Sequence, residues 1–182
     1  MEKTDEIIER CKKGDKEAYR HIVQKYQRMI FTLSIKMLGD EEEAKDTTQE
    51  TFIRAWERLC EYDNKKSFTT WIYTIATHFC IDRIRKAERL TPLPNEEITL
   101  YGYINDKNPQ RTLESRELAA IIRALARNLS TKQRVVFTLC QLEGRTTEET
   151  EELTGLTAQQ IKSNLYVARQ TIREQLKKMG YE

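Results

Sequence analysis

Apolar side chains recur every three or four positions along most of this chain, which is the spacing of amphipathic helices. In residues 15–38 they share one face, made of Ile22, Val23, Tyr26, Ile30, Leu33 and Met37. Gly39 ends that pattern, and Asp40 with Glu43 has the spacing of a capping box at the start of a second helix. On this second helix we expect a core-facing stripe of Phe52, Ile53, Trp56 and Leu59.

A third helix is predicted for SFTTWIYTIATHFCIDRIRK, residues 67–86. Its spacing puts Trp71, Ile72, Ile75, Ala76 and Phe79 in a core seam, and Tyr73, Thr74, Thr77 and His78 toward other faces. Aromatic rings beside cations are typical of a surface that stacks unpaired bases and follows phosphates. Rings in a core, with cations at the favourable C-terminal end of the helix dipole, would give the same sequence. Residue chemistry alone slightly favours this second interpretation.

The C-terminal half carries three capping-box patterns, Ser130/Gln133, Thr146/Glu149 and Thr157/Gln160. The last two helices are joined by LTGLT, a tight turn around Gly155. Two short helices across such a turn predict a helix-turn-helix motif.

The last helix has one apolar face, made of Ile161, Leu165, Ala168, Ile172 and Leu176. Its early polar residues, Gln159, Gln160, Lys162, Ser163 and Asn164, have side chains that can donate to or accept from base edges. A recognition helix enters the major groove with its N-terminal residues first, so these are the positions that would meet bases. By charge pattern alone, an ordinary helix with a solvated basic face is an equally good interpretation.

All three prolines, Pro92, Pro94 and Pro109, fall in a stretch without helical spacing, which predicts an extended linker. No alternating pattern of β-branched residues indicates a sheet. We therefore expect an all-α fold of two helical domains joined by that linker.

Composition narrows the function classes. The net charge of +2 over 182 residues argues mildly against tight DNA binding by the chain alone. No nucleophile–base pattern, metal-ligand spacing or phosphate-binding glycine loop is present, so neither an enzyme nor a metal or cofactor site is predicted. The N-terminus does not resemble a secretory signal and no apolar run approaches the ~20 residues of a membrane span. We expect a cytoplasmic protein without direct membrane insertion.

Three segments in order resemble a known family. Ala44, Asp46, Gln49, Glu50, Phe52, Arg54, Ala55 and Trp56 form A-x-D-x-x-Q-E-x-F-x-R-A-W, which resembles conserved region two of sigma-70 family factors. Residues 67–86 resemble the adjoining promoter-melting segment, and EGRTTEETEELTGLTAQQIKSNLYVAR resembles region four. A short chain with only these two regions and a linker is similar to the extracytoplasmic-function (ECF) class.

The resemblance implies a dissociable sigma subunit of bacterial RNA polymerase that recognises the −35 element as duplex and melts the −10 element. It implies region two at 1–88, a linker at 89–113 and region four at 114–182. The implied partners are the polymerase core, promoter DNA and an anti-sigma factor. The near-neutral charge fits this role, because the polymerase supplies much of the phosphate contact. The acidic residues from Asp40 to Glu50 would be a partner surface, although Glu41, Glu42 and Glu43 also suit a solvated helix start.

The resemblance also assigns site residues. Contacts to the polymerase core are expected from Asp46, Gln49, Glu50 and Arg54. Contacts to the −10 element are expected from Tyr62, Asn64, Lys65, Lys66, Ser67, Phe68, Trp71, Tyr73, Thr77, His78, Arg83, Arg85 and Lys86. Contacts to the −35 element are expected from Thr157, Gln159, Gln160, Lys162, Ser163, Asn164, Tyr166 and Arg169.

Several positions depart from the family pattern. His78 stands where Asn is frequent, and Asn164 where Arg is frequent. Thr150 and Glu151 replace an Ile-Ala pair at which the two helices of the motif pack closely. We expect Glu151 to point outward or to meet a cation such as Arg169 or Lys162, with the first helix of the motif displaced or less stable.

Two other functions are consistent with a helical chain of this kind. A helix-turn-helix regulator with a helical sensor domain would bind a palindromic site as a dimer without being a polymerase subunit. A protein-binding helical module, such as a regulator of sigma factors, would have no need of a base-reading face. The polymerase-docking motif and the polar face of the last helix count against these two hypotheses respectively.

Overall fold

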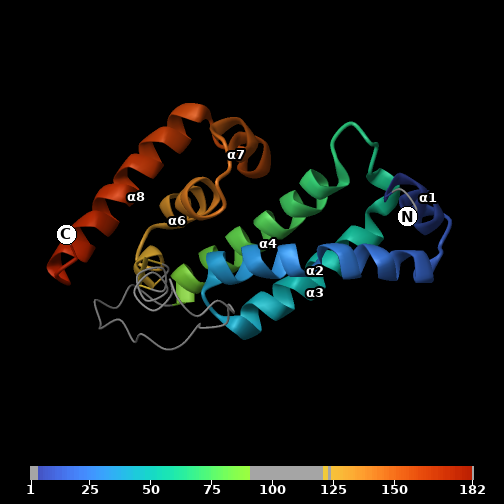
Figure 1. Ribbon diagram of the computed structural model, residues 1–182, viewed down its shortest axis with the longest axis horizontal. Helices are drawn as coiled ribbons and strands as arrows, with labels where there is room; N and C mark the ends of the chain where they lie inside the picture. Colours follow the sequence, from blue (N-terminus) through green and yellow to red (C-terminus); the bar gives the residue numbers. More distant parts are fainter. Residues whose placement is uncertain (1–3, 91–120, 123, 182) are drawn as a thin grey trace, which may run out of the picture. The chain divides into compact units, whose positions relative to one another are not determined.

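The computed structural model in Figure 1 is helical, with no strand among residues 4–90, 121–122 and 124–181, which are the residues it describes. The chain divides into two compact units, Met1–Arg83 with Glu152–Thr154, and Ile84–Glu151 with Gly155–Glu182. The predicted linker, apart from its first two residues, lies outside the described residues. The expected all-α class is confirmed.

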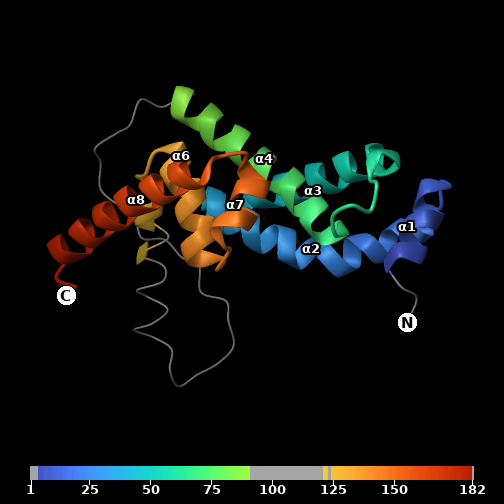
Figure 2. The same ribbon diagram turned by 90° about the horizontal axis from the view of Figure 1, so that it is seen from above.

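The N-terminal part is a bundle of four α-helices, of which α2 packs along both α1 and α3 (Figures 1 and 2). The helices are α1 (Thr4–Lys12), α2 (Lys16–Leu38), α3 (Glu41–Glu57) and α4 (Phe68–Leu90), with a 3-10 turn at Leu59–Glu61. The carboxylate of Asp15 caps α2, and that of Asp40 caps α3 by accepting from the amide of Glu43. Gly39 ends α2 at φ 70°, a left-handed conformation that glycine adopts without steric cost.

The core face of α2 agrees with the sequence prediction, since Ile22, Tyr26, Ile30, Leu33 and Met37 are buried and Val23 is half-buried. The predicted seam of α4 is partly wrong. Ile72 and Ala76 are buried, but Trp71, Ile75 and Phe79 are only half-buried, while Tyr73 and Thr77 are 1% and 0% exposed. A threonine is tolerated in this core because the Thr77 hydroxyl donates to the carbonyl of Tyr73 at 2.8 Å.

The stripe predicted for α3 contains one error. Phe52 and Leu59 are buried and Trp56 is half-buried, but Ile53 is 59% exposed. The core face of α3 is made instead of small and polar residues together with Phe52, namely Ala44, Thr47, Thr51 and Ala55. Small side chains let neighbouring helices approach closely, and the Thr51 hydroxyl is satisfied by the carbonyl of Thr47 at 2.7 Å.

The C-terminal part contains α6 (Thr131–Phe137), a π-helical turn (Thr138–Leu142), α7 (Thr147–Thr154) and α8 (Ala158–Lys178). All three predicted capping boxes are present, at Ser130, Thr146 and Thr157. Gly155 closes α7 at φ 70°, as the tight turn requires. The core joins Ile121, Leu125, Ala126, Leu129, Phe137, Ala168 and Ile172, with Leu165 and Leu176 of α8 packed against it. The predicted apolar face of α8 is confirmed.

Candidate functional site

One face of α3 presents the residues predicted to contact the polymerase. Asp46, Gln49, Glu50 and Arg54 are all exposed. Exposed Ile53 lies seven residues after Asp46 and four after Gln49, so it shares their face. Sequence analysis had placed Ile53 in the core, although its helical spacing from Asp46 could have indicated this surface. The face therefore combines acidic, amide and apolar groups with a single cation, Arg54, which suits a protein partner better than DNA.

Arg54 is held in place on this face by two contacts. Its Nε lies 3.3 Å from Oε2 of Glu57, and its guanidinium carbon lies 5.7 Å from the ring centroid of Phe79 on α4. These contacts fix the direction in which the cation projects from the helix.

Arg83, predicted to contact DNA, faces α3 instead. Its two terminal nitrogens bind the carboxylates of Glu43 and Glu50, the latter at 3.0 Å, and its side chain is only 21% exposed. Glu43 was predicted to complete a capping box with Asp40, but its carboxylate is engaged by this arginine. The ion pairs tie α4 to the exposed face of α3.

The segment between the 3-10 turn and α4 is an exposed loop above an aromatic cluster. The ring centroids of Tyr62, Phe68 and Trp71 lie 5.3–5.4 Å from one another, and Tyr26 of α2 lies 5.5 Å from Phe68. Tyr62 and Phe68 are buried, and the Tyr62 hydroxyl donates to the carbonyl of Lys66 at 2.8 Å. The aromatic cluster is thus linked to the loop backbone through the Tyr62 hydroxyl.

Residues 63–67 of the loop are exposed, among them the predicted contacts Asn64, Lys65, Lys66 and Ser67. Asn64 has φ 59°, a left-handed conformation that asparagine adopts more readily than most residues. Ser67 then starts α4 by accepting from the amide of Thr70 at 3.1 Å.

The residues predicted on α4 divide by exposure. His78, Arg85 and Lys86 are exposed, and Trp71 is half-buried at the edge of the aromatic cluster. Tyr73 and Thr77 are buried in the core, so in this fold they present no side chain to a nucleic acid. Their part is to hold α4 in the bundle.

The residues predicted to contact the −35 element share the N-terminal half of α8. Thr157, Gln159, Gln160, Lys162, Ser163, Tyr166 and Arg169 are exposed, and Asn164 is half-buried. Some of them have local partners: the side chain of Gln160 accepts from the Thr157 amide at 3.0 Å, and Ser163 and Asn164 donate to the Gln160 carbonyl. Gln159 and Lys162 lie on the exposed side of the first turns of α8.

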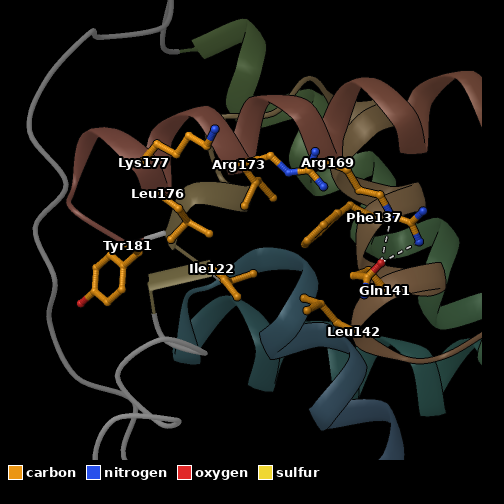
Figure 3. Close-up of a pocket in the computed structure, with 10 residues that line it drawn as sticks. Ile122, Phe137, Gln141, Leu142, Arg169, Arg173, Leu176, Lys177 and Tyr181 are labelled. Carbon is orange, nitrogen blue, oxygen red and sulfur yellow. Dashed lines mark hydrogen bonds between the residues drawn. The ribbon is translucent and has the colours of Figure 1, made fainter.

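Arg169 lies apart from these early turns. Its Nε and Nη2 both donate to Oε1 of Gln141, at 3.1 and 2.8 Å. Figure 3 shows both residues at an open pocket of about 1060 Å³ that sequence analysis missed. Its lining combines apolar side chains from four segments with three cations of α8. The lining residues are Ile122, Phe137, Gln141, Leu142, Arg169, Ile172, Arg173, Leu176, Lys177 and Tyr181. The four-residue spacing of Arg169, Arg173 and Lys177 could have indicated a basic edge.

The helix-turn-helix is closed by Glu151, one of the residues that departs from the family pattern. Its carboxylate accepts from the backbone amide of Ala158 at 2.6 Å, and its carbonyl accepts from Gly155 at 2.8 Å. The expectation that Glu151 would point outward or meet a cation, Arg169 or Lys162, is therefore wrong, because the carboxylate turns to the backbone of α8. The expected weakening of α7 finds no support, since that helix has a complete capping box and a glycine C-cap.

Two further features bear on the kind of site. In the part of the chain that the structure describes, no three histidine, cysteine or acidic side chains come together in a way that could hold a metal ion. Within the same residues, every helix is too short or too polar to cross a lipid bilayer.

Comparison with known proteins identifies a family region in each part of the chain. The family model for sigma-70 region 2 matches residues 22–90, and that for sigma-70 region 4 matches residues 119–172. The chain is 33% identical over 177 residues to the ECF RNA polymerase sigma factor SigW of Bacillus subtilis, covering 93% of this chain and 95% of that protein. It is 26% identical over 185 residues to the RNA polymerase sigma-H factor of Pseudomonas aeruginosa, covering 97% and 95%.

Two solved structures have a similar fold. The sigma factor RpoE of Bartonella quintana, solved with the anti-sigma factor NepR, is 19% identical with a TM-score of 0.66, covering 87% of this chain and 96% of that one. CnrH, solved with the cytosolic domain of CnrY, is 20% identical with a TM-score of 0.63, covering 94% and 95%.

Proposed function

This chain belongs to the ECF class of the sigma-70 family, and from this premise we propose how its surfaces direct bacterial RNA polymerase to promoters. The chain is a promoter-specifying initiation factor. The polymerase would carry out the chemistry of RNA synthesis, and this subunit would supply recognition and strand opening only. Its place of action would then be the cytoplasm. We assign region two to 1–88, the linker to 89–113 and region four to 114–182.

Docking on the polymerase core is assigned to the exposed face of α3. Asp46, Gln49, Glu50 and Arg54 would make its polar contacts, and Ile53 would add an apolar contact that excludes water from them. The ion pairs of Glu43 and Glu50 with Arg83 would hold this face in shape before docking. Interactions that are already oriented cost less entropy on binding.

Opening of the −10 element is assigned to the loop of residues 63–67 and to the exposed cations of α4. An extruded base costs a few kcal/mol of stacking and pairing, which contacts in a pocket must offset. The half-buried ring of Trp71 and the exposed amide of Asn64 offer stacking and hydrogen bonding to such a base. Arg85 and Lys86 would meet backbone phosphates.

Recognition of the −35 element is assigned to the first turns of α8, lying in the major groove. Gln159 can pair through two hydrogen bonds with adenine, and Lys162 can donate to guanine or to a phosphate. Thr157, Gln160, Ser163, Asn164 and Tyr166 would act around them, with their local hydrogen bonds limiting side-chain freedom.

An anti-sigma factor is proposed as a further partner. RpoE, which has a similar fold, was solved with the anti-sigma factor NepR, and CnrH was solved with the cytosolic domain of CnrY, which supports a protein partner of this kind. Affinity purification of the tagged chain from its host in the uninduced state should yield a stoichiometric small protein besides polymerase. Recovery of only free and polymerase-bound chain under all growth conditions would argue against this partner.

The observation that carries the proposal is that both family regions occur in order on a chain whose α3 face and α8 face are exposed. Run-off transcription with bacterial core polymerase and genomic fragments of the host, including the chain's own upstream region, tests it. We expect transcripts with unique starts that require the chain and are lost in Asp46→Ala. Gln24→Ala, at an exposed position of α2, is the control.

The alternative, a dimeric helix-turn-helix regulator, makes a different prediction in the same experiment. It would bind duplex DNA tightly without polymerase and would direct no start from core enzyme. The sequence and fold similarities over nearly the whole chain do not favour it.

A further inference from the structure

Glu151 joins the two helices of the helix-turn-helix in a way that the family pattern does not predict. It lies near the end of α7, and its carboxylate reaches across the turn to the first amide of α8, Ala158, at 2.6 Å. Its own carbonyl accepts from the amide of Gly155 at 2.8 Å within the same turn. One residue thus holds the turn at two points.

Two other groups at the start of α8 are satisfied by its capping box. Thr157 accepts from the amide of Gln160, and the Gln160 side chain accepts from the amide of Thr157. The capping box therefore leaves the Ala158 amide without a partner, and Glu151 provides one. A carboxylate at a helix N-terminus is also favoured by the helix dipole.

We propose that Glu151 is a positioning residue for −35 recognition, which fixes the start of α8 against α7 and places a negative charge at the end of α8 that meets DNA. The first part follows from the hydrogen bond, because the direction of a recognition helix is set by its anchoring at the turn. The second follows from the charge, because DNA phosphates approach the same end of the helix. The consequence for transcription rests on the proposed sigma function.

The two effects oppose each other in free protein. The hydrogen bond keeps the reading face pre-organised, which favours specific binding. The negative charge weakens attraction to any duplex, since like charges at short range repel and the effect is screened by salt. The region would then bind DNA well only when other contacts supply affinity, which agrees with the small net charge of +2.

Three variants of the full chain separate these effects. Glu151→Gln keeps an oxygen that can accept from Ala158 but removes the charge. Glu151→Ala removes both. Glu174→Gln removes the same charge from an exposed position in α8, 16 residues beyond Ala158 and so about 24 Å along the helix.

The hydrogen bond is tested by amide exchange measured by NMR, without DNA or polymerase. We expect the Ala158 amide to exchange several-fold faster in Glu151→Ala than in wild type, and Glu151→Gln to restore most of the protection. Equal exchange of this amide in wild type and Glu151→Ala would overturn the positioning role. This measurement does not depend on the chain being a sigma factor.

The charge is tested by fluorescence anisotropy with a mixed-sequence duplex of about 30 base pairs at low salt, because phosphate attraction is independent of sequence. We expect Glu151→Gln to bind about three- to tenfold more tightly than wild type, with the gain vanishing at high salt. Glu174→Gln should gain much less. An unchanged affinity in Glu151→Gln, or an equal gain in Glu174→Gln, would overturn the charge effect.

Comparing the DNA affinities of the two Glu151 variants separates the effect of the hydrogen bond from the effect of the charge. If positioning matters for DNA binding, Glu151→Ala should bind less tightly than Glu151→Gln although both lack the charge. Equal affinities of these two variants would show that the hydrogen bond has no effect on the reading surface, and would overturn its role in recognition.

Discussion

A single hydroxyl links α2 to the helix that carries the proposed docking face. The Tyr19 hydroxyl donates to the carbonyl of Phe52 at 2.6 Å, and the Tyr19 ring lies 4.8 Å from that of Trp56 in an edge-to-face arrangement. Burial raises the pKa of Tyr19, and the Coulombic influence of Cys11 adds to this. The residue is therefore a source of pH-dependent stability.

We expect Tyr19→Phe to lower the free energy of unfolding by about 1 kcal/mol at pH 8, because a partly buried hydrogen bond is lost. In the unfolded chain the phenol ionises near pH 10, whereas in the folded chain it stays protonated to higher pH. The stabilisation is thus complete below about pH 10 and is lost as pH rises above it. The free energy of unfolding, measured with urea, should therefore differ less between wild type and Tyr19→Phe at pH 11 than at pH 8, by about 1 kcal/mol.

Tyr166→Phe serves as the control for that comparison, since Tyr166 is 65% exposed on α8. Its stability relative to wild type should be nearly the same at both pH values. A difference between wild type and Tyr19→Phe that stays constant with pH would show that the Tyr19 phenol is not linked to folding.

Arg83 connects α4 to α3 through two carboxylates, and its replacement should be felt in the N-terminal part. We expect Arg83→Ala to lower the free energy of unfolding by about 1–2 kcal/mol, because Glu43 and Glu50 lose a shared partner that is mostly shielded from water. Core polymerase affinity should fall as well, since Glu50 loses its orientation. Chemical denaturation and a core-binding titration measure the two effects.

The exposed Lys86 on the same helix provides a matched loss of charge. Lys86→Ala should leave stability unchanged and should weaken promoter DNA binding instead. If Arg83→Ala behaved like Lys86→Ala in both assays, Arg83 would be a DNA contact as the sequence suggested, and the ion pairs would be incidental.

At the scale of elements, the sequence predicted helix ends better than helix faces. The caps at Asp40, Ser130, Thr146 and Thr157 depend on residues within four positions, so the sequence contains the whole interaction. The face of α4 depends on which helices surround it. Tyr73 and Thr77 were predicted on the surface but are buried. Amphipathic spacing alone does not show how much of the circumference of a helix its neighbours cover.

Candidate site residues also divide into those that local spacing predicts and those that depend on contacts distant in the sequence. The exposed set on α3 and the early turns of α8 follow from helical spacing and could be predicted. Arg83, by contrast, meets carboxylates 33 and 40 positions away, which no local pattern indicates. The same holds for Arg169 and Gln141, and for the reach of Glu151 to Ala158 across a turn.

The exposed apolar residue of α3 gives a test of the docking face as a whole. Ile53→Glu should leave the thermal stability unchanged, because the side chain is 59% exposed in the free chain. Core polymerase affinity should fall about tenfold or more, since a charge would be buried against the partner without compensation. Native gel titration with core polymerase measures the affinity, and circular dichroism the stability.

Gln24→Glu adds the same charge at an exposed position of α2 and is the control for Ile53→Glu. It should affect core binding much less. Unchanged core affinity in Ile53→Glu would place the polymerase contact on another surface and leave the exposure of Ile53 without a function.

At the scale of the molecule, each part has its own core. The rings of Tyr26, Phe68 and Trp71 and the ion pairs of Arg83 lie within residues 1–90. The apolar cluster around Phe137 and Ile172 lies within residues 121–176. Because each part has its own core, one part can bind polymerase and open DNA while the other reads duplex DNA.

We expect the fragments 1–90 and 114–182 to fold independently, each with the helical circular dichroism of its part of the whole chain. The C-terminal fragment should be the less stable, because a domain of this size buries less of its surface on folding and this one also carries an open pocket.

Fragment 1–90 should bind core polymerase with an affinity within about tenfold of the full chain, whereas 114–182 should direct no transcription. An equimolar mixture of the fragments should restore little promoter-specific transcription, because the tether supplies the effective concentration. Full activity of the mixture would show that the linker has no such part, and a disordered fragment 1–90 would show that its core depends on the rest of the chain.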